Sequence, residues 1–216
     1  MFQDRRRTFI ERFKWPLTVN EKGHELDEFD DKDAIYVIFH DKYDKHIAST
    51  RIRPTISDTM IGKYFRNIVD YRRIKSDISW EVSRFCTAQT KNVGSHAPAA
   101  VMLTGCKLAD KIGVRNFVGL SYPRQVRIWA AFGWTAEILA RSESGETPIL
   151  ACSWKVDEAA CGALSRRLRK QIAAGLFQED YDLPERATRP WEEADFPPPN
   201  PGSFAPPPMP AMSTVF

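Results

Sequence analysis

The sequence is poor in the features that mark metal sites, disulfide scaffolds and membrane proteins. Its four cysteines (Cys86, Cys106, Cys152 and Cys161) are widely spaced, with no CxxC pair and no histidine cluster beside them. We therefore expect no metal and no disulfide framework, but reduced thiols in a cytoplasmic protein. No apolar run approaches the roughly 20 residues that cross a bilayer. The charged start MFQDRRRTFIERF also differs from a signal peptide, so no membrane association is expected.

Several catalytic motifs are absent as well. The sequence contains no GxSxG, HExxH or GxxxxGK pattern. Its histidines are scattered and form no motif with a cysteine: His24, His40, His46 and His96. A Cys–His nucleophile is therefore not expected. The formal net charge of +3 is too small to indicate nucleic acid as a partner.

What is present is an ordinary globular composition followed by a proline-rich end. The 216 residues are 43% hydrophobic and 27% charged, which favours one domain, residues 1–186. Residues 187–216 include DFPPPNPGSFAPPPMPAMSTVF, whose prolines lack backbone donors, so an extended or disordered tail is expected. This tail is acidic, which leaves the domain more basic. That balance suits an acidic partner, a phosphorylated ligand or a plain solvated surface.

Extended and helical patterns alternate along the domain. Runs of β-branched and aromatic residues predict strands at 33–41, 46–55, 78–87, 114–121 and 148–156. The first two flank the polar turn DKYDK and predict an antiparallel hairpin. Apolar periodicity with glycine and proline boundaries predicts helices at 97–113, 123–134 and 157–175. The order of elements predicts an α/β (α+β) sandwich in which helices flank one mixed sheet.

The stretch SWEVSRFC, residues 79–86, places two charges in an otherwise apolar extended run. In a regular strand Glu81 and Arg84 point to opposite faces, because successive side chains alternate. A bulge between them would bring both to one side. Taken alone, the pattern is better explained by an edge strand whose charges meet solvent or a neighbouring strand.

A longer series of residues changes that interpretation. The motifs RRRTFIERFKW, ELDEFDDKDA, STRIRPT, TMIGKYF and WEVSRF supply, in this order, Arg5, Phe9, Trp15, Asp27, Asp30, Arg51, Phe65, Glu81, Arg84 and Phe85. This series resembles the acyl-homoserine lactone synthases, the LuxI-type autoinducer synthases of bacterial quorum sensing. The resemblance runs from Arg5 to Phe85 and continues more loosely to the FGW motif that ends at Trp134.

The resemblance implies a fold, two substrates and a reaction. The fold is an N-acetyltransferase-like three-layer sandwich, with a twisted mixed central sheet and a V-shaped cleft between two splayed strands. The substrates are S-adenosylmethionine and an acyl thioester, carried on acyl carrier protein or on coenzyme A. Acyl transfer to the amine is followed by lactonisation, which releases methylthioadenosine. No tightly bound cofactor is implied, and a monomer is expected.

The same resemblance assigns roles to the motif residues. The catalytic group is expected to comprise Asp27, Asp30, Arg51, Glu81 and Arg84. The residues that bind S-adenosylmethionine are expected to be Arg5, Phe9, Trp15, Phe65 and Phe85. The ammonium group of this substrate must lose a proton before it attacks a thioester, and a desolvated glutamate can accept that proton. Aromatic rings can stack on adenine or meet the sulfonium, while guanidinium groups can bind a carboxylate or pair with the acids.

Two further groups are expected around the acyl donor. The acyl pocket should be lined by Val101, Leu103, Leu120, Ser121, Ile128, Trp129 and Leu150. The Ser121 hydroxyl could favour a chain oxygenated at its third carbon, or could lie on the surface at a strand end. An acidic carrier protein could dock on a basic group, which ordinary solvation explains equally well: Arg124, Arg127, Lys155, Arg166 and Arg167.

Two departures from the family leave alternatives open. Family members carry a strand and the beginning of a helix before the Arg5 position, whereas this chain begins inside that helix. Either its start lies upstream or it lacks the first strand. The loop AQTKNVGSHAPAA lacks the QxxGxG pyrophosphate pattern of acetyltransferases, which slightly favours a carrier protein over free coenzyme A. The alternatives are an acyltransferase acting on another amine and a catalytically inactive binding or regulatory protein.

Overall fold

The computed structural model describes residues 1–41, 43–88, 96–142 and 148–173. The predicted tail, residues 187–216, lies outside them and stays a prediction. Within these described ranges, no helix is both long and apolar enough to cross a membrane.

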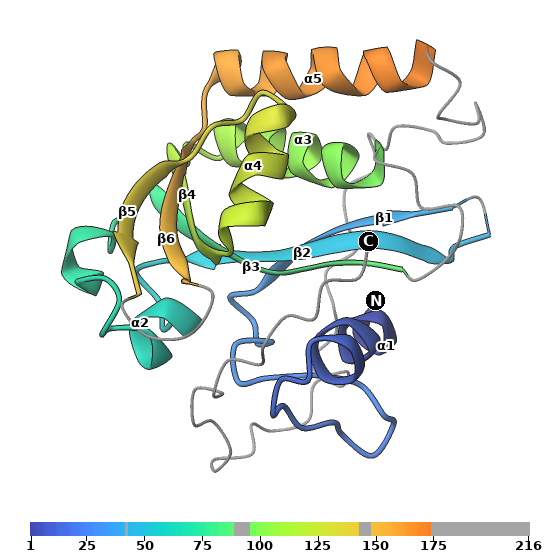
Figure 1. The fold of residues 1–216 in the computed structure, drawn as a ribbon, viewed down its shortest axis with the longest axis vertical. Helices are drawn as coiled ribbons and strands as arrows, with labels where there is room; N and C mark the ends of the chain where they lie inside the picture. The colour runs from blue at the N-terminus through green and yellow to red at the C-terminus, as the bar shows by residue number, and fades with distance from the viewer. Residues whose placement is uncertain (42, 89–95, 143–147, 174–216) are drawn as a thin grey trace.

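A six-stranded mixed sheet forms the centre of the fold, in the order β1-β2-β3-β4-β6-β5 (Figure 1). Its strands are β1 (Ile35–His40), β2 (His46–Pro54), β3 (Ser79–Thr87), β4 (Asn116–Ser121), β5 (Glu137–Arg141) and β6 (Leu150–Lys155). The helical elements are α1 (Phe2–Arg5), the π-helix η1 (Arg6–Arg12), α2 (Met60–Tyr64), the short 3₁₀ helix η2 (Tyr71–Arg73), α3 (His96–Lys111), α4 (Pro123–Ala131) and α5 (Glu158–Ala173). Strands β3 and β4 run parallel, and the other neighbouring pairs are antiparallel.

The predicted strands and the predicted long helices are all present, and β1 pairs with β2 as the expected hairpin. Gly113 follows α3 with a φ of 83°, a conformation that glycine adopts readily at the end of a helix. Three elements were not predicted: β5, α2 and the three-residue η2. The edge strand β5 is short and exposes Ile138, so no clear alternation marks it, and α2 is only five residues long.

The two faces of the sheet are covered differently, as Figure 1 shows. The face under α3 and α5 carries the main hydrophobic core, which includes Ile52, Val101 and Leu164. The other face is covered by α1, η1 and α2. It carries a small apolar cluster around Ile61 and a group of buried charged residues. The functional residues are therefore expected on this second face.

Strands β3 and β4 separate partway along their length. Their pairing ends at Glu81 and Val118, although β3 continues to Thr87 and β4 to Ser121. Because paired strands stay about 4.8 Å apart, the unpaired ends diverge into a V, which is visible in Figure 1. The splayed pair expected from the resemblance is present, and Glu81 lies at its vertex.

The first residue of β4 beyond this vertex is Gly119, and a side chain there would collide with β3. A Cβ atom on Gly119 would lie 2.9 Å from the carbonyl oxygen of Val82. Since backbone would have to shift, we expect Gly119→Ala to lower the free energy of unfolding in urea by about 1–3 kcal/mol. Gly105→Ala in α3 is the matched control, because its Cβ would meet only Val37, at 3.8 Å. Equal results for the two variants would show that the vertex tolerates a side chain.

Two cysteines that are distant in sequence meet between α3 and α5. The Sγ atoms of Cys106 and Cys161 lie 2.8 Å apart, and Cys106 is fully buried. Their spacing in the sequence did not indicate this contact, which arises because both helices pack on the same face of the sheet.

Candidate active site

A β-bulge in β3 turns Arg84 to the side of the sheet on which Glu81 lies. The register with β2 shifts between Ser49 and Arg51, where β3 contains one extra residue. Arg84 has a φ of 52°, a left-handed conformation that bulges use. The buried positions of β3 change phase at this point, so Glu81 and Arg84 are both buried on the same face. The bulge that the sequence left as a possibility is therefore present.

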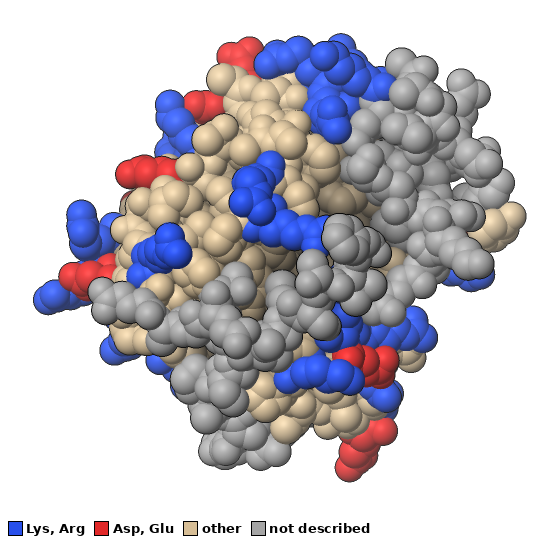
Figure 2. Space-filling view, in the orientation of Figure 1, with Lys and Arg blue, Asp and Glu red and all other residues tan. Residues whose placement is uncertain are grey.

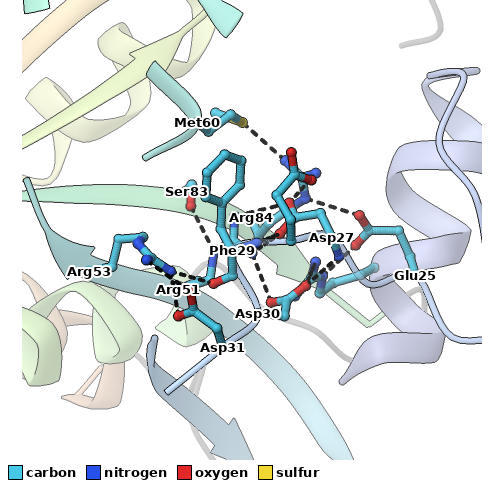
Figure 3. A network of polar contacts seen from close by, with 12 residues as sticks. Glu25, Asp27, Phe29, Asp30, Asp31, Arg51, Arg53, Met60, Ser83 and Arg84 are labelled. Atoms are coloured by element: carbon cyan, nitrogen blue, oxygen red, sulfur yellow. Dashed lines mark hydrogen bonds and ion pairs between the residues drawn. The ribbon is translucent and has the colours of Figure 1, made fainter. Parts of the chain in front are cut away.

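Arg84 belongs to a buried group of charged residues that we call the ionic ring (Figure 3). Its members come from α1, the loop between η1 and β1, β2 and β3: Arg5, Glu25, Asp27, Asp30, Arg51 and Arg84. None of the six side chains is more than 7% exposed. Three cations face three anions, so their charges balance.

Cations and anions alternate around this ring. The ion pairs follow the order Arg5, Glu25, Arg84, Asp27, Arg51, Asp30 and back to Arg5. The six N–O distances lie between 2.5 and 3.2 Å. Each guanidinium group thus bridges two carboxylates, and such forked contacts fix orientation as well as charge. The ring joins α1, the acidic loop and both central strands into one rigid unit.

The charge state of the ring acids follows from their neighbours. Burial opposes the charge on Asp30, but Arg5 and Arg51 hold its pKa well below its usual value. Burial likewise opposes the charge on Asp27, and Arg51 is the main cause that lowers its pKa. Burial and the adjacent Asp30 raise the pKa of Tyr36, whose hydroxyl donates to Asp30 at 2.5 Å. Asp27 and Asp30 are therefore ionised and already paired at neutral pH.

Glu81 differs from the ring acids because backbone amides bind its carboxylate. It is fully buried, and it accepts hydrogen bonds from the N–H groups of Met60 at 3.2 Å and Ile61 at 2.8 Å, in the first turn of α2. Burial raises the pKa of Glu81, and the two amides oppose this only in part. A carboxylate with a raised pKa is a stronger base than an ordinary glutamate, which suits a general base.

Met60 connects Glu81 with the ionic ring. Its N–H binds Glu81, and its Sδ atom accepts a hydrogen bond from Nη1 of Arg84 at 3.2 Å (Figure 3). A thioether is a weak acceptor. The Nη1 group of Arg84 is therefore less strongly engaged than the donors that bind the ring carboxylates.

Phe9 lies beside Arg84, and Trp15 lies beside Phe9. The guanidinium carbon of Arg84 is 5.4 Å from the ring centre of Phe9, which lies on η1. The ring of Trp15 is 5.1 Å from that of Phe9. Cation–π contacts of this kind form a surface on which a flat or cationic group can bind.

The other two predicted aromatic residues come from α2 and β3. Phe65 is half-buried at the C-terminal end of α2. The bulge that turns Arg84 toward the ring turns Phe85 to the opposite face, where its ring meets Trp129 at 5.0 Å. Their role in binding S-adenosylmethionine stays a prediction.

The residues expected around the acyl chain divide between the two faces. Those in the main core are Val101, Leu103, Trp129 and Leu150. Leu120 packs against the Ile61 cluster on the other face, because its side chain points away from that of its neighbour Ser121. Ser121 is half-buried at the end of β4, and Ile128 is 41% exposed. The full set does not meet at one place.

Four residues of the site were missed from the sequence: Glu25, Tyr36, Arg53 and Met60. Arg53 is buried, pairs with Asp31 at 2.7 Å and faces Glu81 across the β2–β3 ladder. It follows Arg51 by two positions, so strand alternation could have placed it on the same face. Glu25 belongs to the acidic run that supplies the other ring acids. No local pattern indicates Tyr36 or Met60.

Comparison with known proteins places most of this chain in one family. The chain matches the family model described as autoinducer synthase over residues 1–164. It is 24% identical over 170 residues to the acyl-homoserine-lactone synthase of Ralstonia solanacearum, with 74% of this chain and 82% of that protein covered. It is 31% identical over 141 residues to the acyl-homoserine-lactone synthase of Acinetobacter nosocomialis, with 61% and 76% covered.

Solved structures share the fold. BjaI, a coenzyme A-dependent acyl-homoserine lactone synthase solved with S-adenosylmethionine and isopentyl-CoA, has a TM-score of 0.69 at 17% identity, covering 78% of this chain and 80% of that one. A Lactobacillus plantarum protein assigned as an N-acetyltransferase has a TM-score of 0.50 at 13% identity, covering 71% and 87%. These likenesses confirm the predicted N-acetyltransferase-like fold. Because the family model matches most of the chain, this protein belongs to the autoinducer synthase family.

Proposed function

We propose that this protein is an acyl-homoserine lactone synthase, which transfers an acyl chain from a thioester to the amine of S-adenosylmethionine and then forms the lactone. Membership of the autoinducer synthase family supports this function. The observation that carries the mechanism is Glu81, a fully buried carboxylate with a raised pKa at the vertex between β3 and β4. Arg84 is turned to the same side of the sheet.

Glu81 acts as the general base in the first step. It accepts a proton from the substrate ammonium group, directly or through one water molecule, and contributes about a hundredfold to ten-thousandfold in rate. The freed amine attacks the thioester carbonyl, so that a C–N bond forms, the C–S bond breaks and the thiol carrier leaves. The splayed strands allow the thioester to approach Glu81 from the open end of the V.

Arg84 is the arginine that binds the substrate carboxylate. The other two ring arginines direct their terminal nitrogens at ring carboxylates. Within the described residues, Nη1 of Arg84 instead donates to the thioether of Met60. Phe9, which lies beside it, and Trp15, which packs against Phe9, bind the adenine or the sulfonium, a contact worth roughly 0.5–2 kcal/mol. The ring acids then act chiefly by holding the arginines in place.

The second step needs little from the protein beyond positioning. The substrate carboxylate attacks its own γ-carbon, the C–O bond of the lactone forms, and the C–S bond to the sulfonium breaks to release methylthioadenosine. Holding the two reacting atoms close together supplies much of the rate of such intramolecular steps.

The direct test is mass spectrometry of the medium from a bacterium that lacks quorum-sensing genes and expresses this protein. We expect acyl-homoserine lactones in the medium and methylthioadenosine in the reaction of the purified enzyme. Soluble, folded protein that yields neither would contradict the proposal. An acylated amine formed without methylthioadenosine would indicate an acyltransferase that acts on another substrate.

Acyl carrier protein is the proposed acyl donor, and the exposed basic residues favour it. Arg124 and Arg127 on α4 and Arg166 on α5 are exposed, and Figure 2 shows Lys and Arg side chains gathered over these helices. Lys155 is less available, because it pairs with an aspartate at 3.0 Å. Arg167 is only partly exposed, with its guanidinium over a phenylalanine ring. The docking surface is therefore narrowed to the first three arginines.

Reversing two of these charges is expected to weaken docking of an acidic carrier. Arg124→Glu combined with Arg127→Glu should lower kcat/KM for the acyl carrier substrate about tenfold at low salt, with the KM for S-adenosylmethionine unchanged. The difference should shrink at high salt, because surface charges are screened. Arg72→Glu is the control, since Arg72 is an exposed arginine on a different element, η2. Undiminished activity of the double variant would place the carrier elsewhere or favour coenzyme A as the donor.

A further inference from the structure

A second polar chain runs beside the ionic ring, and we call it the His46 chain. It joins Asp4 of α1, His46 and Ser49 of β2, and Cys86 of β3. Nδ1 of His46 lies 2.9 Å from Oδ2 of Asp4, and Nε2 lies 2.9 Å from Oγ of Ser49. That hydroxyl lies 3.5 Å from Sγ of Cys86. The side chains of His46 and Asp4 are 7% and 11% exposed, and the other two residues are buried.

The hydrogen bonds of the His46 chain all run from donor to acceptor in one direction, toward Asp4. Burial, followed by the nearby amino terminus, lowers the pKa of His46 to about 4, so its ring is neutral at pH 7. A neutral imidazole donates from one nitrogen and accepts at the other. Because the Asp4 carboxylate accepts, Nδ1 donates to it and Nε2 accepts the hydroxyl hydrogen of Ser49. Cys86 completes the chain by donating its S–H to Ser49.

The order of acid, imidazole and hydroxyl matches that of a serine hydrolase, but Ser49 cannot serve as a nucleophile. It is 1% exposed, and its hydroxyl is enclosed between Nε2 of His46 and Sγ of Cys86. A nucleophile must reach the carbonyl of its substrate. The His46 chain is therefore not a second active site, and its bonds serve to hold structural elements together.

The elements that it joins are those of the ionic ring. In α1, Asp4 of the chain is followed directly by Arg5 of the ring, and in β3, Cys86 lies two residues after Arg84. The helix α1 and η1 together form one short helical segment, Phe2–Arg12. Because a helix this short has little stability of its own, its place on the sheet depends on tertiary contacts such as these.

We propose that His46 is a positioning residue that docks α1 on the sheet, so that Arg5 and Phe9 are held at the S-adenosylmethionine site. This inference rests on the proposed function. The helix α1 continues directly into η1, which carries Phe9, so a shift of α1 moves both residues together. Glu81 stays in place, because β3 and the first turn of α2 hold it. Loss of the His46 chain should therefore weaken substrate binding more than it slows the chemical step.

The test compares His46→Phe and His46→Asn with the wild type. His46→Phe keeps a ring but removes both nitrogens, and should raise the KM and the calorimetric Kd for S-adenosylmethionine about tenfold, with kcat within about threefold. His46→Asn keeps a donor toward Asp4 and should recover most of the affinity. The matched control is His40→Phe, because His40 is the cross-strand partner of His46 and has a half-exposed side chain. It should leave both constants unchanged.

Three results would overturn the inference. The KM of His46→Phe could be unchanged, its kcat could fall by as large a factor as its KM rises, or His46→Asn could bind S-adenosylmethionine no better than His46→Phe. If His46→Phe shows no cooperative unfolding transition, Asp4→Asn applies the same test from the other end of the chain, with the same expected split. Wild-type protein that binds no S-adenosylmethionine by calorimetry would instead overturn the proposed function, before any variant is compared.

Discussion

Glu81→Gln is expected to lower kcat by about a hundredfold to ten-thousandfold, which is the usual contribution of a positioned general base. The amide has the shape of the carboxylate but cannot take a proton from the substrate amine. Its oxygen can still accept the N–H of Ile61, which binds Glu81 at 2.8 Å, so α2 should remain in place. The affinity for S-adenosylmethionine should change little. Release of methylthioadenosine at saturating substrate measures the loss.

The pH dependence of the wild-type enzyme provides a second measurement of the same role. Burial raises the pKa of Glu81 above the ordinary value of 4.5, so the carboxylate takes up its proton at a higher pH than an exposed glutamate does. We therefore expect kcat/KM to fall with decreasing pH through the raised pKa of this residue. The residual activity of the glutamine variant should lack this decrease. A fall in activity that the variant retains would belong to another group.

The same shift predicts how the substitution affects stability. The folded protein binds the Glu81 proton more tightly than the unfolded chain, so the stability contributed by this group is lost as pH rises through its folded-state pKa. A neutral amide avoids that loss, and the Tm of the variant at neutral pH should not fall. Glu137→Gln on the exposed edge strand β5 is the control for both assays. Near-normal turnover of Glu81→Gln would show that Glu81 is not the general base. A lowered Tm would show that its carboxylate mainly stabilises the first turn of α2.

The position of Arg84 shows where prediction from the sequence ended. Alternation along β3 separates Glu81 from Arg84, and the sequence supported a shared face only through the resemblance of the whole series. The bulge that unites them depends on the register with β2 and on the left-handed backbone at Arg84. Both are set by pairing between strands that are distant in the chain. The same non-local event sends Phe85 toward α4, which no pattern in SWEVSRFC indicates.

The ionic ring was predicted in part for a similar reason. Its acids come from the loop between η1 and β1, whose path has no period from which faces could be assigned. Two hydrogen bonds from backbone N–H groups to side-chain carboxylates stabilise the loop. The N–H of Phe29 donates to the carboxylate of Asp27 at 2.9 Å, and the N–H of Asp27 donates to the carboxylate of Asp30 at 2.8 Å. The motifs identified which residues matter. Only the folded loop shows that Glu25 closes the ring between Arg5 and Arg84.

For the predicted acyl pocket, the alternation of side chains along β4 was not taken into account. Leu120 and Ser121 are neighbours in one strand, so their side chains cannot line the same wall while the strand is regular. The structure places Leu120 with Ile61 and places Leu150, the partner of Ser121, in the main core. Strand periodicity alone could have divided the predicted set in this way.

Arg51→Ala is expected to destabilise the protein by about 3–5 kcal/mol, because it leaves two buried carboxylates without one of their partners. Arg51 is fully buried and contacts Asp27 at 2.5 Å and Asp30 at 2.8 Å. The energy arises mainly from the carboxylates left unpaired, since an intact buried pair is itself close to neutral for stability. Thermal unfolding should show a decrease in Tm of roughly 10 °C for a domain of this size. Adding Asp27→Asn and Asp30→Asn to this variant should recover part of the loss.

The control for this prediction is Arg72→Ala, which also deletes a guanidinium group from an ion pair. Arg72 is 91% exposed and pairs with Asp70 at 3.1 Å, so its loss should cost under about 1 kcal/mol. If Arg51→Ala costs no more than this control, water reaches the ring and its carboxylates are free to bind the cationic substrate. If Arg51→Ala lowers the free energy of unfolding several times more than Arg72→Ala, the ring carboxylates are engaged in ion pairs with the arginines and do not bind the substrate. The charge complementarity of the site would then reside in Glu81 and in the Arg84 donor that meets Met60, which is the division of roles proposed here.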